Sequence, residues 1–196
     1  MIIIAHRVNK IEDLKKIPPE YGVEIDVRCK GEQLILNHEP HQEGDNLIDY
    51  LHHFHHRFIV FDIKEAGIEE EVIGIAKRAG IEDYFLLDVE YPFIYRATRK
   101  LGFRKIAIRF SEAESIEAAR GHISLLDWVW IDTNTMLPLD PGSISVLRNF
   151  KTCIVCPERW GRPQDIPKYI SLMKKLNYLP NAVMTNIKYA KEWEKI

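Results

Sequence analysis

The sequence is poor in cysteine and carries no disulfide framework. Its three cysteines, Cys29, Cys153 and Cys156, are an odd number without regular spacing, which excludes a disulfide-stapled scaffold. Cys153 and Cys156 form a CxxC inside an apolar run, and an offset of three residues along a strand sends two side chains to opposite faces. This pattern favours packing over redox or metal chemistry, and a reducing cytoplasm is the expected location.

Long apolar runs and an excess of one charge are missing as well. No run approaches the roughly 18 residues of a transmembrane helix, and the first residues, Met1–Arg7, lack the basic and apolar regions of a signal peptide. The formal net charge is -2, so neither nucleic acid nor a membrane surface is expected as an obligatory partner. The composition leaves the oligomeric state open.

Short apolar runs recur along the chain and predict buried strands. They are rich in Ile, Val, Phe and Tyr, as the strands of a parallel sheet are. The predicted strands are Ile2–Ala5, Val23–Val27, Phe58–Ile63, Tyr84–Val89, Lys105–Phe110, Trp128–Asp132, Thr152–Cys156 and Ala182–Thr185. A ninth run, Gln33–Asn37, follows the turn signal Lys30–Gly31 and is predicted to be the second arm of a hairpin.

Amphipathic stretches between these runs predict helices. Two of them, Ile68–Ala79 and Tyr91–Leu101, are followed by glycines, which are common just after a helix. Ser111–Arg120 opens with a serine and two early glutamates, a helix-start pattern. The remaining candidates are Asn46–His55, Ser143–Phe150, Gln164–Asn177 and Ile187–Lys195, and Lys10–Ile17 is expected to be a short helix or a turn.

Strands and helices alternate at a spacing of roughly 25 residues, which is typical of β/α architecture. We therefore predict one α/β domain over residues 1–196, a compact (β/α)8 TIM barrel with a short β-hairpin after the second strand. An open doubly wound sheet is the structural alternative. No Gly-rich phosphate loop follows the first strand, which argues against a dinucleotide-binding protein.

Polar side chains at the carboxyl ends of the predicted strands identify a candidate site, because function collects there in a parallel β/α fold. Glu24 and Asp26 are two residues apart and share one face of their strand, as do Asp62 and Lys64. An acidic residue inside an apolar strand is costly unless it is paired or binds a metal. The candidate residues are His6, Arg7, Glu24, Asp26, His38, Asp62 and Lys64.

Three carboxylates from adjacent strands can converge on one divalent cation, and oxygen ligands suit Mg2+, Ca2+ or Mn2+. Histidines beside that cation, His6 and His38, would supply an acid and a base near neutral pH. Arg7 and Lys64 would hold a phosphate. The structural alternative is that the same carboxylates form salt bridges with Arg7 and Lys64 and catalyse nothing.

An aromatic residue and a histidine run lie outside this group. Trp160 stands between basic residues after the seventh predicted strand and is expected either to cover a substrate or to pack. His52 and His56 are four residues apart in a predicted helix, where a solvated polar face is favoured over a metal site. Asp88 and Arg109, at two further strand ends, are weaker candidates for the pocket.

The strand-end motifs occur in a recognisable order. They are His6-Arg7-Val8, Glu24-Ile25-Asp26, Leu34-Ile35-Leu36-Asn37-His38, Asp62-Ile63-Lys64 and Thr185-Asn186. In this order they resemble the motifs of the glycerophosphodiester phosphodiesterase family, which is related in fold to phosphatidylinositol-specific phospholipases C. The resemblance is carried mainly by the first three strands, and beyond Lys64 it is architectural.

The resemblance implies a role for each residue. Glu24, Asp26 and Asp62 would be the metal ligands, His6 and His38 the general base and acid, and Arg7 and Lys64 the phosphate-binding groups. It also implies that a neighbouring hydroxyl of the substrate can attack phosphorus and expel the other alcohol. The expected activity is metal-dependent hydrolysis of a small, glycerophosphodiester-like compound, as in lipid metabolism.

The chain departs from the family pattern at several points. Val8 replaces a glycine, Asp62 replaces a glutamate, Glu39 replaces an aspartate, and only the short segment Glu39–Phe58 separates His38 from the third strand. Two alternatives to hydrolysis therefore remain. One is a relative that binds a phosphate ligand without cleaving it, and the other is a lyase that releases a cyclic phosphate.

Overall fold

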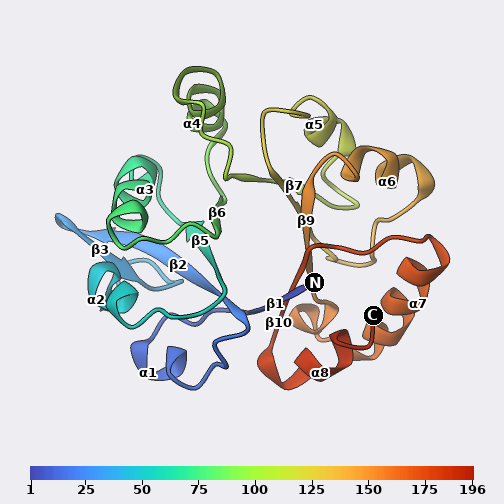
Figure 1. The fold of residues 1–196 in the computed structure, drawn as a ribbon, viewed down its shortest axis with the longest axis horizontal. Helices are drawn as coiled ribbons and strands as arrows, with labels where there is room; N and C mark the ends of the chain where they lie inside the picture. Colours follow the sequence, from blue (N-terminus) through green and yellow to red (C-terminus); the bar gives the residue numbers. More distant parts are fainter. The chain divides into compact units, whose positions relative to one another are not determined.

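The computed structural model describes residues 1–196, which form two compact units. The N-terminal unit comprises Ile4–Arg96, and the C-terminal unit comprises Met1–Ile3 with Ala97–Ile196. Strands and helices alternate along both units (Figure 1), as the rhythm of the sequence predicts. No helix combines the length and the apolar character that crossing a membrane requires.

The N-terminal unit contains four parallel strands and an antiparallel hairpin. Strand β2 pairs in parallel with β1 and β5, and β5 pairs in parallel with β6, while β3 and β4 extend the sheet from β2 in antiparallel pairs. The elements are β1 (Ile2–Ala5), α1 (Ile11–Leu14), β2 (Gly22–Lys30), β3 (Gln33–Leu36), β4 (Asp45–Asn46), α2 (Leu47–His52), β5 (Phe58–Ile63), α3 (Glu69–Arg78), β6 (Tyr84–Leu87) and α4 (Tyr91–Arg96).

The central strands of this unit are buried on both faces, which explains their nearly continuous apolar sequence. Ile25 and Val27 on β2 are fully buried, as are Ile59 and Phe61 on β5. The acidic side chains of β2 alternate with these apolar ones, so they all project from the opposite face of the strand. In the register of β2 and β5, Asp26 stands directly opposite Asp62.

The C-terminal unit contains a parallel sheet in the order β10-β9-β8-β7. Its helices alternate with these strands, and the first residues of the chain join it through the hydrogen bond from the Ile2 amide to the Asn181 carbonyl, 2.8 Å long. The elements are η1 (Ala97–Leu101), β7 (Ala107–Phe110), α5 (Ile116–Arg120), β8 (Trp128–Ile131), α6 (Pro141–Leu147), β9 (Lys151–Val155), η2 (Pro157–Trp160), η3 (Pro163–Asp165), α7 (Ile166–Lys175), β10 (Ala182–Thr185), η4 (Ile187–Tyr189) and α8 (Ala190–Trp193).

The predicted strands and hairpin are confirmed, with ends shifted by a few residues, but two predicted helices are partly wrong. The helix predicted from Ser111 begins at Ile116, because Ser115 accepts the amide of Glu117 as its cap, while the Ser111 hydroxyl accepts the amides of Ala113 and Glu114 in a turn. The helix predicted over Asn46–His55 ends at His52.

The early end of α2 also changes the reading of the histidine run. His56 lies beyond the helix, and its Nε2 contacts the carbonyl of Ile17 at 2.9 Å. His52 and His56 therefore do not share a helix face, and their expected helical spacing is wrong. The single barrel domain over residues 1–196 stays a prediction.

Candidate functional site

Three carboxylates from β2 and β5 meet within the N-terminal unit. Glu24, Asp26 and Asp62 are 2%, 1% and 6% exposed, and ligand oxygens of all three lie within 4.8 Å of one another. They converge because Glu24 and Asp26 share a face of β2 and because the register places Asp62 beside Asp26. Burial of three acidic groups at one point requires compensating partners.

The loop after β1 supplies part of that compensation through its backbone. Arg7 has a left-handed φ of 54°, which turns its amide toward the Glu24 carboxylate at 2.7 Å. The next amide, of Val8, donates to the Glu24 carbonyl at 2.9 Å. The predicted contact between Arg7 and Glu24 is thus made by the peptide group, and the Arg7 side chain stays exposed.

Val8 occupies the position that a glycine holds in the family pattern. Its side chain is 4% exposed and belongs to the core, and its carbonyl accepts the buried hydroxyl of Tyr50 at 2.7 Å. The left-handed conformation falls on Arg7, one residue earlier, so the backbone at Val8 makes no demand that only glycine can meet.

Asn9 completes the loop and contacts Asp26 in two ways. Its side-chain nitrogen donates to Asp26 Oδ2 at 2.7 Å, and its side-chain oxygen accepts the Asp26 amide at 2.8 Å. Sequence reasoning missed this residue, because only folding brings the loop after β1 against β2. The available signal is weak: an amide side chain three residues after His6, in the same loop.

Lys64 is the cation of the cluster. Its Nζ contacts Asp62 Oδ2 at 2.5 Å and Asp26 Oδ1 at 3.1 Å, and it lies 3.9 Å from Asp88 Oδ2. Asp88 therefore joins the edge of the site, as its strand-end position suggests. The Asp62–Lys64 pair of the structural alternative is present, but one ammonium stands against three buried carboxylates.

The excess of negative charge raises the pKa of two of these acids. Burial, followed by repulsion from Asp26 and Asp62, raises the pKa of Glu24 well above its usual value. Burial, followed by repulsion from Asp88, raises the pKa of Asp62 to about 7. Burial opposes the charge of Lys64, but the attraction of Asp62 and Asp26 outweighs it and raises the pKa of the ammonium.

The donor set fits a divalent cation. Asp62 Oδ1 and Asp26 Oδ1 are buried and have no hydrogen-bond partner, although Lys64 lies near the second of these atoms. Each such atom costs about 1–3 kcal/mol unless something satisfies it. Carboxylate oxygens alone make up the set, which is the chemistry that Mg2+, Ca2+ and Mn2+ prefer.

The two predicted catalytic histidines lie in the same unit as the cluster. His6 Nε2 is 3.9 Å from Glu24 Oε2, and the His6 side chain is 21% exposed. His38 follows Asn37, whose amide donates to the Asp26 carbonyl at 3.1 Å, and its Nδ1 contacts Glu39 Oε1 at 2.7 Å. His6 thus lies near the Glu24 carboxylate of the cluster. His38 follows directly after Asn37, the residue that is hydrogen-bonded to the Asp26 backbone.

A pocket of about 510 Å³ runs beside these residues, between the loop after β1 and the segment after β3. Most of the residues that line it have polar side chains, and they include two predicted site residues, Arg7 and His38. It is lined by Arg7, Asn9, Lys10, Leu36, Asn37, His38, Glu43, Gly44 and Asp45.

The remaining predicted residues belong to the C-terminal unit. Trp160 ends η2, is 47% exposed, and has the Arg159 guanidinium over its ring at 5.4 Å. Arg109 pairs with Asp132, and the Thr185 hydroxyl donates to Glu158. The structure brings His6, Arg7, Glu24, Asp26, His38, Asp62 and Lys64 into one unit, and Trp160 lies in the other.

Comparisons with known proteins identify the fold. No family model matches the sequence, and neither does any curated protein. Among solved structures, a glycerophosphodiester phosphodiesterase from Agrobacterium tumefaciens str. C58 is 13% identical, with a TM-score of 0.67 over 95% of this chain and 97% of that one. A glycerophosphoryl diester phosphodiesterase from Parabacteroides distasonis ATCC 8503 is 11% identical, with a TM-score of 0.66 over 99% and 86%.

A third structure is a phosphodiesterase from Oleispira antarctica in complex with the product sn-glycerol-3-phosphate. It is 14% identical, with a TM-score of 0.68 over 99% of this chain and 97% of that one. The chain therefore has the TIM-barrel-like α/β fold of these phosphodiesterases. The resemblance seen in the sequence motifs is confirmed at the level of fold.

Proposed function

We propose that the protein is a metal-dependent phosphodiester hydrolase that cleaves a small, glycerophosphodiester-like substrate. The observation that carries this proposal is the buried cluster of Glu24, Asp26 and Asp62, which leaves carboxylate oxygens unsatisfied on two adjacent strands. The shared fold with solved phosphodiesterases supports the same assignment.

Glu24, Asp26 and Asp62 are the residues that would hold the divalent cation. When bound, such a cation polarises a phosphoryl oxygen and neutralises the charge that develops in the transition state. Asn9 and the Arg7 amide orient two of the three ligands through the hydrogen bonds that they donate to Asp26 and Glu24. Lys64 neutralises part of the remaining charge and fixes the Asp62 carboxylate.

The two histidines are assigned to proton transfer. His6, beside the Glu24 carboxylate, is placed to take the proton of the attacking hydroxyl or water. Glu39 contacts Nδ1 of His38, and a carboxylate there holds the proton on Nδ1, so that Nε2 is the nitrogen that exchanges a proton with the substrate. His38 is therefore assigned as the acid that protonates the leaving alcohol.

Arg7 and the pocket beside it are assigned to substrate binding. The Arg7 guanidinium is exposed at the pocket wall and can form a bidentate contact with a phosphate. Lys64 is the second residue predicted to bind phosphate, and its ammonium also pairs with Asp62 and Asp26. The polar lining suits an alcohol that carries hydroxyl groups. The Oleispira antarctica phosphodiesterase binds sn-glycerol-3-phosphate as product, which supports a glycerol-containing diester here.

The test is turnover of a panel of glycerophosphodiesters with Mg2+, Ca2+ or Mn2+ and after treatment with a chelator. We expect cation-dependent release of a phosphomonoester, and we expect His6→Ala to abolish it while the circular dichroism spectrum stays unchanged. His53→Ala, an exposed histidine after α2, is the matched control and keeps full activity. Unchanged turnover in His6→Ala, or turnover that ignores the chelator, would contradict the proposal.

The product also separates hydrolysis from its alternatives. Phosphorus NMR of the product distinguishes a phosphomonoester from a cyclic phosphate that accumulates, which would indicate a lyase. A protein that binds the diesters without cleaving any of them would be a binding relative. A cytoplasmic location and a role in lipid metabolism are proposals that follow from the free thiols and from the proposed substrate.

A further inference from the structure

Arg28 lies next to the proposed site without belonging to the carboxylate cluster. It follows Asp26 by two residues on β2, so the alternation of the strand puts its side chain on the same face as Glu24 and Asp26. The side chain is 15% exposed, which is unusual for an arginine near a strand end. A buried guanidinium needs fixed acceptors for its five N–H groups.

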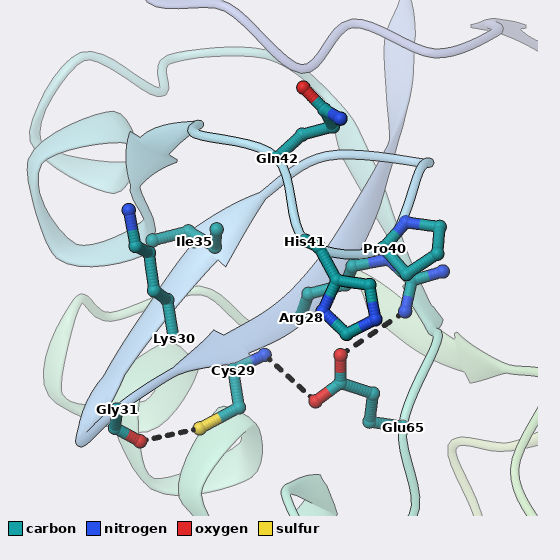
Figure 2. A pocket seen from close by; sticks show the side chains of 9 residues that line it. All are labelled: Arg28, Cys29, Lys30, Gly31, Ile35, Pro40, His41, Gln42 and Glu65. Carbon is teal, nitrogen blue, oxygen red and sulfur yellow. Dashed lines mark hydrogen bonds and ion pairs between the residues drawn. The ribbon is translucent and has the colours of Figure 1, made fainter.

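The guanidinium joins two segments that are far apart in the sequence. Its Nε and Nη2 donate to the backbone carbonyl of His38 at 3.2 and 2.8 Å, and its Nη1 donates to Glu65 Oε1 at 3.1 Å. Figure 2 shows Glu65 between Arg28 and the backbone of Cys29, whose amide donates to Glu65 Oε2 at 3.2 Å. One oxygen of Glu65 therefore accepts from Arg28, and the other fixes Glu65 to the backbone of β2.

His38 needs such support because it has left the sheet. Strand β3 ends at Leu36, and His38 belongs to the connection that leads to β4. Its ring contacts the neighbouring Glu39, which is itself exposed in the same connection. The Arg28 guanidinium is held by Glu65, which directly follows Lys64. It therefore connects the His38 backbone to β2 and β5, the strands that carry the cluster.

We infer that Arg28, anchored by Glu65, is a positioning residue that sets the place of the His38 imidazole relative to the carboxylate cluster. The inference rests on the proposed function, because that function gives His38 its acid role. Arg28 touches neither substrate nor cation in this assignment, and it acts only through the peptide of His38. Its loss should therefore affect the proton-transfer step and leave the binding of the cation and the substrate nearly intact.

The first test is the kinetics of Arg28→Met with a glycerophosphodiester and Mg2+. We expect kcat to fall by about 10- to 100-fold, because a shift of about 1 Å in a catalytic group has effects of this size. KM and the Mg2+ concentration for half-maximal activity should change little. Arg28→Lys, which keeps one donor, should lie between Arg28→Met and the wild type, and an unchanged kcat in Arg28→Met would overturn the inference.

A matched control separates positioning from general damage. Arg96 pairs with Glu70 in the same unit, so Arg96→Met also removes an arginine–glutamate pair, but one that is exposed and does not contact His38. We expect full activity in this control. The decisive step is a double-mutant cycle, in which Arg28→Met has no further effect on kcat once His38 is alanine. An equal loss of kcat in both backgrounds would show that Arg28 acts independently of His38.

The second test does not depend on turnover. In protein labelled at histidine, the ring signals of His38 are assigned by their loss in His38→Ala. Arg28→Met should shift or broaden these signals, while Arg96→Met leaves them unchanged. Unperturbed His38 signals in Arg28→Met would overturn the inference, whether or not the protein is an enzyme. Perturbed signals in a protein that cleaves no diester would refute the proposed function alone.

Discussion

Replacement of Asp62 by asparagine should make the metal-free protein more stable and inactive at the same time. Asp62 is 6% exposed and its pKa is raised to about 7 from the ordinary 3.8, with burial the main cause and Asp88 the next. A shift of about three pKa units corresponds to about 4 kcal/mol, because each unit is worth about 1.4 kcal/mol. The ionised carboxylate therefore destabilises the folded protein unless a cation is bound.

The sign of the pH dependence follows from the direction of the shift. Well below pH 3.8, Asp62 is protonated in the folded and unfolded chains alike and costs nothing. As the pH rises toward 7, the unfolded chain loses the proton first, so the free energy of unfolding falls. The cost reaches its full size, about 4 kcal/mol, above pH 7 and is about 2 kcal/mol at pH 5.

The assay is urea unfolding of wild type and Asp62→Asn in a chelator, at pH 8 and at pH 5. Asparagine keeps the shape but carries no charge, so we expect a gain of up to about 4 kcal/mol at pH 8 and a smaller one at pH 5. Asp83→Asn, an exposed aspartate in the same unit, is the control and should change neither midpoint.

Addition of Mg2+ should remove most of the stability advantage of Asp62→Asn. Wild type binds the cation and gains about 2.7 kcal/mol at a hundredfold excess over Kd, whereas Asp62→Asn has lost a ligand and gains little. The variant should also have lost its cation-dependent turnover. An Asp62→Asn protein that is no more stable than wild type at pH 8 in chelator would refute the view that the cluster is under electrostatic strain.

Three further substitutions test other parts of the site. Lys64→Met should lower the free energy of unfolding in chelator by about 3–5 kcal/mol, because the carboxylates lose their only close ammonium, and Mg2+ should restore part of that loss. Asn9→Ala should weaken Mg2+ binding by about 10- to 100-fold in a calorimetric titration, because it removes both contacts to Asp26, and unchanged affinity would contradict its orienting role. Trp160→Ala should leave the urea unfolding midpoint nearly unchanged, because the ring is 47% exposed, and a clear fall in the midpoint would assign the ring to packing.

Much of the fold follows from local pattern. The strand at Phe58–Ile63 is predicted to the residue, because a continuous apolar run of β-branched and aromatic side chains is typical of a strand that is buried on both faces. Gly80 and Gly102 have left-handed φ values of 72° and 64°, as the predicted helix ends require. Where two local signals compete, pattern fails: Ser111 and Ser115 both suit a helix cap, and only the path of the chain selects Ser115.

The carboxylate site is partly visible in the same way. The spacing of Glu24 and Asp26 predicts a shared face, because side chains alternate along any strand. Their convergence with Asp62 depends on a register that pairs strands more than thirty residues apart, and the motif order suggested it only through resemblance. The contacts of Asn9, Tyr50 and Arg28 were not predicted, because each joins two segments that are not adjacent in the sequence.

The sequence by itself therefore determined which segments become strands and which strand faces carry acids, since both depend on periodicities of a few residues. The tertiary structure decided what those acids meet. It placed Lys64 between Asp62 and Asp26, turned the Arg7 amide toward Glu24 and tied His38 to Arg28. These contacts arise from the pairing of distant strands, and the energy of a buried charge depends on every group packed around it, which no local pattern contains.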